Sequence, residues 1–250
     1  MKPLDYFFDT PAEGPGHFPQ RFCAFFLGLI KVLFGLVFRY KAYDAEYVQK
    51  SQTYILAANH RCYLDPLFIM MALRPRPIRY MSKEEFFKVF GVARVAAWVG
   101  TFPVKRNAAD TKAIKRSVAM LKRGELVGIF PEGTRGRGLN EQELENRPAH
   151  EGVAVVAYLA KCEVIPVRLF GAERISPPVK KLWRFPQVTA RFGKPLSLTD
   201  ARYEGLEKAE RLNRFTKDVM RAVYALENPR VRKDKNTPEN PRVRKDKGLS

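Results

Sequence analysis

The sequence predicts an α/β domain built on a mostly parallel β-sheet flanked by helices, with a helical segment before it. Two observations predict this fold. Short apolar runs rich in strand-forming residues alternate with longer amphipathic runs along most of the chain, and this alternation is typical of βαβ units. Two unusual polar loops also follow such apolar runs, and α/β proteins place their sites beyond the carboxyl ends of parallel strands.

The first elements are an N-terminal apolar run and a strand–loop–helix unit. The run over residues 21–40 contains five phenylalanines and carries Lys31 near its middle. A central lysine disfavours a membrane span by roughly 2.5–3.5 kcal/mol, so we expect an interfacial helix, with a buried core helix as the alternative. Residues 52–59 predict a strand. Residues 65–73 predict a helix, because Asp65 suits the N-cap and a proline follows it.

The later elements continue the same alternation. Further strands are predicted at 78–83, 101–106 (a short strand or turn), 125–130 and 163–171, and a late strand followed by a turn is predicted at 187–198. Further helices are predicted at 84–100, 110–124, about 151–161 and 200–226. Pro166 stands inside one predicted strand and indicates either a sheet edge or a bulge there.

These elements predict three parts. Residues 1–45 form an N-terminal segment with the interfacial or membrane-anchoring helix, and residues 46–226 form the α/β domain. Residues 227–250 form a basic tail in which ENPRVRKDK occurs twice, at 227–235 and 239–247. Such a composition cannot bury a core, so we expect a disordered extension. It is either an electrostatic tether to anionic lipid or a solvated tail without a role.

Charge and cysteine content narrow the class of protein. The chain has 45 Lys and Arg against 26 acidic residues, a net charge of +19, which favours polyanionic partners such as nucleic acid, anionic lipid or phosphorylated cofactors and carriers. The three scattered cysteines show neither a disulfide framework nor metal-ligand spacing, so a reducing compartment is expected.

The first polar loop contains a histidine and an aspartate five residues apart. His60 follows the predicted strand, and Asp65 begins the next helix. If the loop between them folds back, the carboxylate meets one ring nitrogen and leaves the other as a general base. Alternatively, Asp65 is only an N-cap and His60 only a polar surface residue.

Two further loops carry groups suited to an anion. Glu132 and Arg135 follow a predicted buried strand, and Gly133 between them allows close backbone approach to a ligand. The Arg135 guanidinium matches phosphate geometry, and Glu132 is expected to accept from a substrate hydroxyl. Lys105 and Arg106 are adjacent cations after a turn, suited to a shared anion or to solvent.

These residues resemble those of the 1-acyl-glycerol-3-phosphate (lysophosphatidate) acyltransferase family. The resemblance rests on four ordered motifs over roughly residues 50–200: NHRCYLD (59–65), GTFPVKR (100–106), FPEGTR (130–135) and VIPV (164–167). It implies the glycerolipid acyltransferase fold and a membrane-associated enzyme on the cytoplasmic face. The enzyme would move a fatty acyl group from acyl-CoA or acyl carrier protein, without a further cofactor, to the free hydroxyl of a lysophospholipid acceptor.

The resemblance also implies roles for single residues. His60 is the base and Asp65 its partner. The acceptor phosphate is bound by Arg106 and Arg135, in a site that Glu132 organises. The substrate-binding set implied in full is Lys105, Arg106, Glu132, Gly133, Thr134 and Arg135. The chain departs from the family at Glu151, where a basic residue is usual, and this bears on which acceptor is used.

Other readings remain open at this point. The acceptor is lysophosphatidate or, alternatively, glycerol 3-phosphate, another lysophospholipid or a lyso-aminolipid. A basic nucleic-acid-binding module fits the charge, but no zinc spacing, basic zipper or aromatic RNA-binding signature supports it, so no nucleic-acid partner is expected. A metal hydrolase using His60 and Asp65 lacks further ligands, because His17 and His150 lie in polar stretches that we expect to be unrelated, and no metal is predicted.

Overall fold

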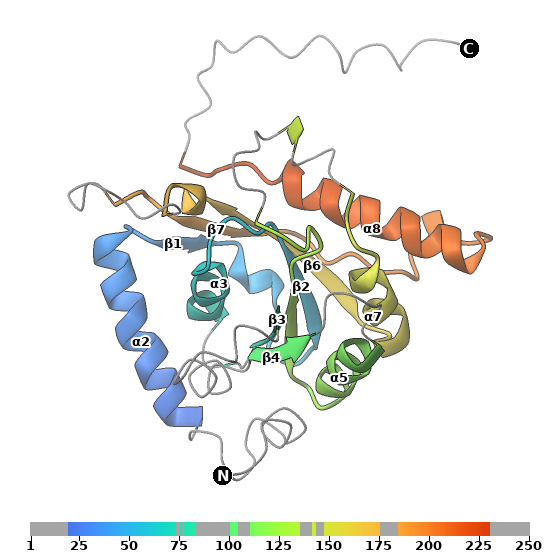
Figure 1. Cartoon of the computed structure of the whole chain (residues 1–250), viewed down its shortest axis with the longest axis horizontal. Helices are drawn as coiled ribbons and strands as arrows, with labels where there is room; N and C mark the ends of the chain where they lie inside the picture. The colour runs from blue at the N-terminus through green and yellow to red at the C-terminus, as the bar shows by residue number, and fades with distance from the viewer. Residues whose placement is uncertain are drawn as a thin grey trace.

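The structure is a computed structural model that describes residues 20–73, 76, 78–83, 101–104, 111–135, 142–143, 148–175 and 185–230 (Figure 1). The helices of this part are α2 (Gln20–Val37), α3 (Asp65–Leu73), α5 (Thr111–Lys122), α7 (Gly152–Ala160) and α8 (Lys208–Ala225). The strands are β1 (Lys41–Tyr43), β2 (Tyr54–Ala58), β3 (Ile78–Lys83), β4 (Thr101–Val104), β5 (Leu126–Ile129), β6 (Glu163–Phe170) and β7 (Thr189–Phe192). The helix predicted at 84–100 and the tail from 231 lie outside the described residues.

The strands of the described residues form one seven-stranded sheet in the order β1-β7-β6-β2-β5-β3-β4. The five strands from β6 to β4 are mutually parallel, which confirms the predicted mostly parallel sheet. β7 runs antiparallel to β6, and β1 runs parallel to β7. The carboxyl ends of β2, β5 and β6 therefore meet at one edge of the sheet, where the loops that follow them lie together.

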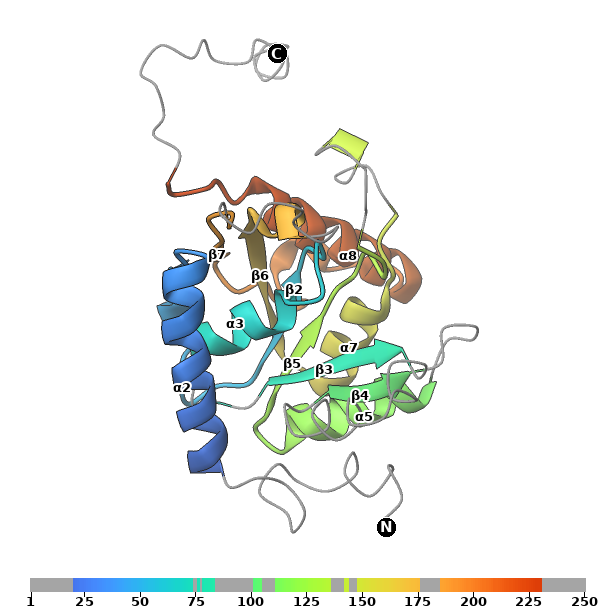
Figure 2. The same cartoon turned by 60° about the vertical axis from the view of Figure 1, so that its left-hand side comes forward.

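Helices cover both faces of this sheet. α2 and α3 lie against one face, and α5, α7 and α8 lie against the other (Figures 1 and 2). β2 shows how the sequence serves both sides: Leu56 packs into the core under α3, whereas its neighbours Ile55 and Ala57 pack into the core under α5 and α7. All five residues of β2 are buried, as expected for a parallel strand covered on both faces.

α2 is apolar on two sides. Ile30, Phe34 and Val37 pack against the core beside α3, and the Phe34 ring lies 5.2 Å from that of Phe68. The opposite side exposes five large apolar side chains, Phe25, Leu29, Val32, Leu33 and Leu36. A helix is thus present at the predicted position. No helix among the described residues combines the length and apolar character that a membrane crossing requires.

Two predicted boundaries differ from the structure. β1, inside the segment assigned to residues 1–45, pairs along its whole length with β7, so the sheet begins before residue 46. α8 begins at Lys208 and not at residue 200. A 3-10 turn over Ala201–Tyr203 comes first, and Gly205 then adopts a φ of +73°, which is incompatible with a continuous right-handed helix.

Pro166 lies in an interior strand, so the predicted sheet edge is wrong, and the irregularity in the pairing has its extra residue on the segment opposite β6. Val164 pairs with Leu196 and Val167 pairs with Phe192, so three residue steps along β6 face four on the opposite segment. The proline, which has no N–H, lies within this interruption, and its carbonyl accepts a hydrogen bond from Gly193 N at 2.8 Å.

Candidate active site

The site begins where β2 ends. Asn59 continues the pairing of β2 with β6 through its side chain, which donates to Leu169 O at 3.0 Å and accepts from Leu169 N at 2.7 Å. Because the side chain takes over these bonds, the main chain can leave the sheet at His60 without orphaning buried polar groups. β5 pairs directly with β2, so the loop after β5 lies beside His60.

Asp65 organises the loop between His60 and α3. Its carboxylate is fully buried and accepts hydrogen bonds from Arg61 N at 2.5 Å and Cys62 N at 2.8 Å. The same oxygen lies 2.8 Å from His60 Nδ1. The interpretation of Asp65 as an N-cap of its own helix is therefore wrong, because the side chain folds back over the preceding loop. Several donors compensate for burying the charge.

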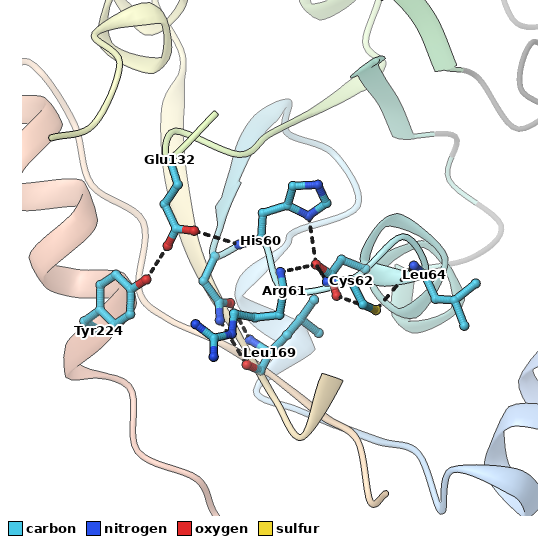
Figure 3. Close-up of polar contacts among 9 residues, drawn as sticks. His60, Arg61, Cys62, Leu64, Glu132, Leu169 and Tyr224 are labelled. Carbon is cyan, nitrogen blue, oxygen red and sulfur yellow. Dashed lines mark hydrogen bonds and ion pairs between the residues drawn. The ribbon is translucent and has the colours of Figure 1, made fainter. Parts of the chain in front are cut away.

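The contact with Asp65 defines the orientation of the imidazole. A carboxylate only accepts, so in the neutral imidazole His60 Nδ1 carries the proton and Nε2 has the lone pair. In Figure 3 this second nitrogen points away from the carboxylate. The His60 side chain is 19% exposed whereas Asp65 is not exposed at all. The pair thus places an accepting nitrogen at the surface and its partner in the interior.

An aromatic stack supports the face of the imidazole. The rings of His60 and Phe130 are 4.3 Å apart and inclined by 24°, and the Phe130 ring in turn stacks on Tyr80 at 5.6 Å. Gly128 makes room for this stack, because a Cβ there would lie 2.0 Å from the Tyr80 ring. Two buried strands, β3 and β5, therefore hold the imidazole plane in place.

Glu132 connects the two loops with α8. It accepts from His60 N at 3.2 Å with one carboxylate oxygen and from the Tyr224 hydroxyl with the other (Figure 3). Burial raises the pKa of Glu132, while these two donors oppose the rise. The residue is 3% exposed. We had expected Glu132 to accept from a substrate hydroxyl, but its carboxylate is too buried for that contact. Its two hydrogen bonds instead connect the loop after β5 with His60 and with α8.

Gly133 and Arg135 turn back toward the first loop. Gly133 has a φ of +67°, a conformation that favours glycine, and its N–H donates to Phe130 O at 3.0 Å. Two residues later the Arg135 guanidinium lies over the exposed ring of Tyr63, 3.5 Å from its centroid. Arg135 Nη1 is buried and has no hydrogen-bond partner among the described residues. Arg135 thus contacts the same loop that carries His60.

The other predicted residues are placed as follows. Thr134 is exposed beside Arg135, and its N–H donates to Glu132 O at 2.8 Å. β4 ends at Val104, and Lys105 and Arg106 lie outside the described residues. Within the described part, no three His, Cys, Asp or Glu side chains are grouped so as to hold a metal ion.

Cys62 is a structural member of the loop. Its side chain is buried, and Sγ donates to Asp65 at 3.1 Å and accepts from Leu64 N at 3.3 Å. Burial and the neighbouring carboxylate raise the pKa of the thiol. A thiolate nucleophile is disfavoured under these conditions.

Sequence reasoning missed four residues of this site: Tyr63, Phe130, His150 and Tyr224. His150 had been assigned to an unrelated polar stretch, but its N–H donates to Pro131 O at 2.8 Å. Its ring also lies against Gly133. Two signals were available: His150 directly precedes a predicted helix, and it neighbours Glu151, the position at which the chain departs from the family. Tyr224 carried none, because its helical spacing is also that of a core residue.

The comparisons with known proteins agree with this geometry. A family model described as acyltransferase matches residues 39–169, more than half of the chain. The chain belongs to the acyltransferase family. It is thereby an enzyme of the O-acyltransferase type, and the resemblance seen in the sequence is confirmed.

Several similar proteins carry one name, 1-acyl-sn-glycerol-3-phosphate acyltransferase. The Bacillus subtilis protein is 28% identical over 83% of this chain and 96% of its own length. The Streptococcus pneumoniae protein is 28% identical over 63% of this chain and 56% of its own length. A human protein of that name with the suffix alpha is 29% identical over 55% of this chain and 47% of its own length.

A solved structure shares the fold of this acyltransferase. It is the crystal structure of the 1-acyl-sn-glycerophosphate (LPA) acyltransferase PlsC from Thermotoga maritima, with a TM-score of 0.61. The match covers 84% of this chain and 83% of the other, at 19% identity. It supports the α/β architecture described above.

Proposed function

We propose that this acyltransferase moves a fatty acyl group from a thioester donor to the free hydroxyl of lysophosphatidate, giving phosphatidate for phospholipid biosynthesis. One observation carries the proposal: His60 Nδ1 contacts a fully buried carboxylate that the loop backbone also binds. This arrangement suits a general base, since the tautomer is defined and the imidazolium that forms is stabilised.

The proposed reaction needs no covalent intermediate on the enzyme. His60 Nε2 takes the proton of the acceptor hydroxyl as the oxygen attacks the thioester carbonyl. The C–S bond then breaks, and the imidazolium returns the proton to the leaving thiolate, which departs as a thiol. A thioester is already activated, so orientation and base catalysis supply the acceleration.

The acceptor headgroup is assigned to the loop after β5. The Arg135 guanidinium is held over Tyr63 and keeps a buried, unpaired Nη1 among the described residues, so it retains hydrogen-bonding capacity for a phosphate. Glu132 in the same loop accepts a hydrogen bond from the Tyr224 hydroxyl of α8, which anchors the loop to that helix. Lys105 and Arg106 are proposed as further cations. The shared name of the relatives supports lysophosphatidate as the acceptor.

The donor is either acyl-CoA or acyl carrier protein. Both are anionic, and the net charge of +19 attracts either of them. The proposal requires no cofactor beyond this co-substrate.

The lipid substrates imply a membrane surface, and α2 is the proposed contact. Its outward stripe includes Leu36 at 76% and Phe25 at 72% exposure, while Lys31 and Arg39 are exposed at its middle and end. A helix with this pattern lies in the headgroup region with its apolar side in the acyl chains. We place this surface on the cytoplasmic face. In a cell lysate, the protein is expected to pellet with membranes and to require detergent for release.

The test is a panel of acceptors run with the purified protein and both donor types. The panel holds lysophosphatidate, glycerol 3-phosphate, other lysophospholipids and a lyso-aminolipid, and kcat/KM is measured for each. We expect lysophosphatidate to have the highest value. Equal or better turnover of another acceptor would replace lysophosphatidate by that acceptor, and no acyl transfer with any pair would contradict the proposed reaction.

A further inference from the structure

The chain that follows α8 is bound to the sheet before the basic tail begins. Arg168 of β6 donates from Nη1 to Tyr224 O in the last turn of α8 and, at 2.9 Å, to Leu226 O. Arg191 of the neighbouring strand β7 donates from Nη1 to Glu227 O at 2.9 Å. Two strands thus determine the path of the chain after α8, and this path leads toward the β1 edge of the sheet.

The path ends at the C-terminal end of α2. The Arg230 guanidinium donates from Nη2 to Arg39 O, and Arg39 lies two residues after the end of α2. The Arg39 side chain donates in turn to Phe185 O at 3.2 Å. Both views show the segment after α8 running to this end of α2 (Figures 1 and 2). Residues 231–250 therefore begin beside α2, although α8 itself covers the opposite face of the sheet.

The surface at this end of α2 combines apolar and cationic side chains. Leu36 in the last turn is 76% exposed, and Arg39 and Lys41 are exposed just after the helix. The affinity of an interfacial helix for a bilayer grows with its buried apolar area and with its attraction to anionic lipid. Both kinds of group are therefore present where the tail begins.

The tail adds positive charge and little apolar surface. Residues 231–250 contain seven Lys and Arg against three acidic residues, and they include no aromatic residue. Each copy of the repeat contains four cations, and in the first copy one of these is Arg230, which contacts α2. Charge is thus the main property through which the tail can attract a partner.

We propose that residues 231–250 bind anionic lipid headgroups on the same membrane surface that α2 contacts, and that residues 226–230 place them there. The inference rests on the membrane contact of α2 in the proposed function. Two linked contacts multiply in affinity only when both can reach the same membrane at once. The hydrogen bond between Arg230 and Arg39 O meets this condition, because it starts the tail at the edge of the apolar stripe.

The test measures binding of the full-length protein to sedimented lipid vesicles. One set of vesicles contains only phosphatidylcholine, and the other contains phosphatidylcholine with phosphatidylglycerol. Binding is measured at about 0.1 M and about 1 M salt, where the Debye length is about 10 Å and about 3 Å. The tail variant replaces the four cations of the second copy: R242Q, R244Q, K245Q and K247Q. The matched control removes four exposed cations of α8: K208Q, R214Q, K217Q and R221Q.

We expect the tail variant to bind anionic vesicles at least about tenfold more weakly than wild type at the lower salt concentration. The α8 control should stay within about twofold of wild type, because its charges lie on the other face of the sheet and are screened from the bilayer. Tail variant and wild type should bind equally at the higher salt concentration and to phosphatidylcholine alone. Equal binding of anionic vesicles by tail variant and wild type, or an equal loss in the α8 control, would overturn the inference.

Acyl transfer in uncharged detergent micelles separates this inference from the proposed reaction. Both variants should keep the wild-type kcat and the wild-type KM for each substrate, because no anionic bilayer is present. Vesicle binding that depends on the tail, in a protein that acylates no acceptor, supports the tail contact and contradicts the proposed reaction. A raised KM for acyl carrier protein in the tail variant, with unchanged vesicle binding, would make the tail a donor contact and overturn the lipid contact. Wild-type protein that binds neither kind of vesicle would contradict both the tail contact and the membrane contact of α2.

Discussion

The loop after β2 and the loop after β5 lie side by side, but they use their polar groups in opposite ways. In the first, backbone N–H groups and the His60 imidazole converge on the buried Asp65. In the second, Glu132 is turned inward, whereas Arg135 keeps a nitrogen without a partner among the described residues. The difference separates two tasks: the first loop orients a reactive nitrogen, and the second retains capacity to bind an anion.

Replacing Asp65 should have the larger effect on chemistry. In Asp65→Asn the amide group would face N–H donors with its own NH2 group, and His60 would lose the acceptor that defines its tautomer. We expect kcat to fall by about a thousandfold. Asp200→Asn changes an exposed carboxylate that binds Arg202 and should leave kcat unaltered.

Urea unfolding curves of both variants test whether the loss of kcat comes from the chemical step and not from loss of the folded structure. The Asp65 variant should remain folded at the assay temperature, although less stable, since buried donors lose their partner. A fully active D65N enzyme would contradict the claim that the loop after β2 orients the reactive nitrogen of His60.

Replacing Arg135 should act on binding. In Arg135→Ala the phosphate loses a charge-assisted donor, and we expect the KM for lysophosphatidate to rise roughly tenfold while the KM for the acyl donor stays the same. The matched control is Arg202→Ala, because Arg202 also lies over a tyrosine, Tyr203, but belongs to an exposed turn before α8. A fall in kcat without a change in the acceptor KM would show that Arg135 acts on the chemical step and not on binding of the acceptor phosphate.

Replacing Glu132 should have the smallest effect on turnover and a characteristic effect on stability. Burial raises the pKa of Glu132 above its usual value of 4.5, so the folded state binds this proton more tightly than the unfolded state. The ionised residue therefore costs stability, and this cost appears as the pH rises above 4.5 through the raised pKa.

The Glu132→Gln protein lacks this titration. We expect its urea midpoint, relative to wild type, to be higher at pH 7.5 than at pH 4.5, with kcat reduced only severalfold. A difference between the two proteins that stays constant across this range would show that Glu132 titrates as an ordinary carboxylate.

Much of the fold was predictable because its signals are local. The apolar run of β2 and the Asp-Pro start of α3 specify a strand and a helix from a few neighbouring residues, and α3 has the predicted bounds. β1 was missed because three residues carry no periodicity, and its partner β7 lies about 150 residues away along the chain.

The candidate site was predictable in its members but not in their contacts. His60 and Asp65 meet as their spacing allowed, since five residues close a short loop. The bonds of Glu132 join residues 72 and 92 positions apart in the sequence, and the contact of Gly133 with His150 is set by the path between β5 and α7. Such contacts depend on which loops the strand order of the sheet brings together. A local sequence pattern does not contain information about that order.

The central claim is that His60 is the base, and the rate of acyl transfer by the His60→Ala protein tests it most directly. The measurement uses saturating lysophosphatidate and acyl donor, with a urea unfolding curve on the same preparation. We expect kcat to fall by about a thousandfold with the unfolding midpoint close to that of wild type, because the imidazole lies on a partly exposed loop. A folded H60A protein with kcat within about tenfold of wild type would contradict a base at this position.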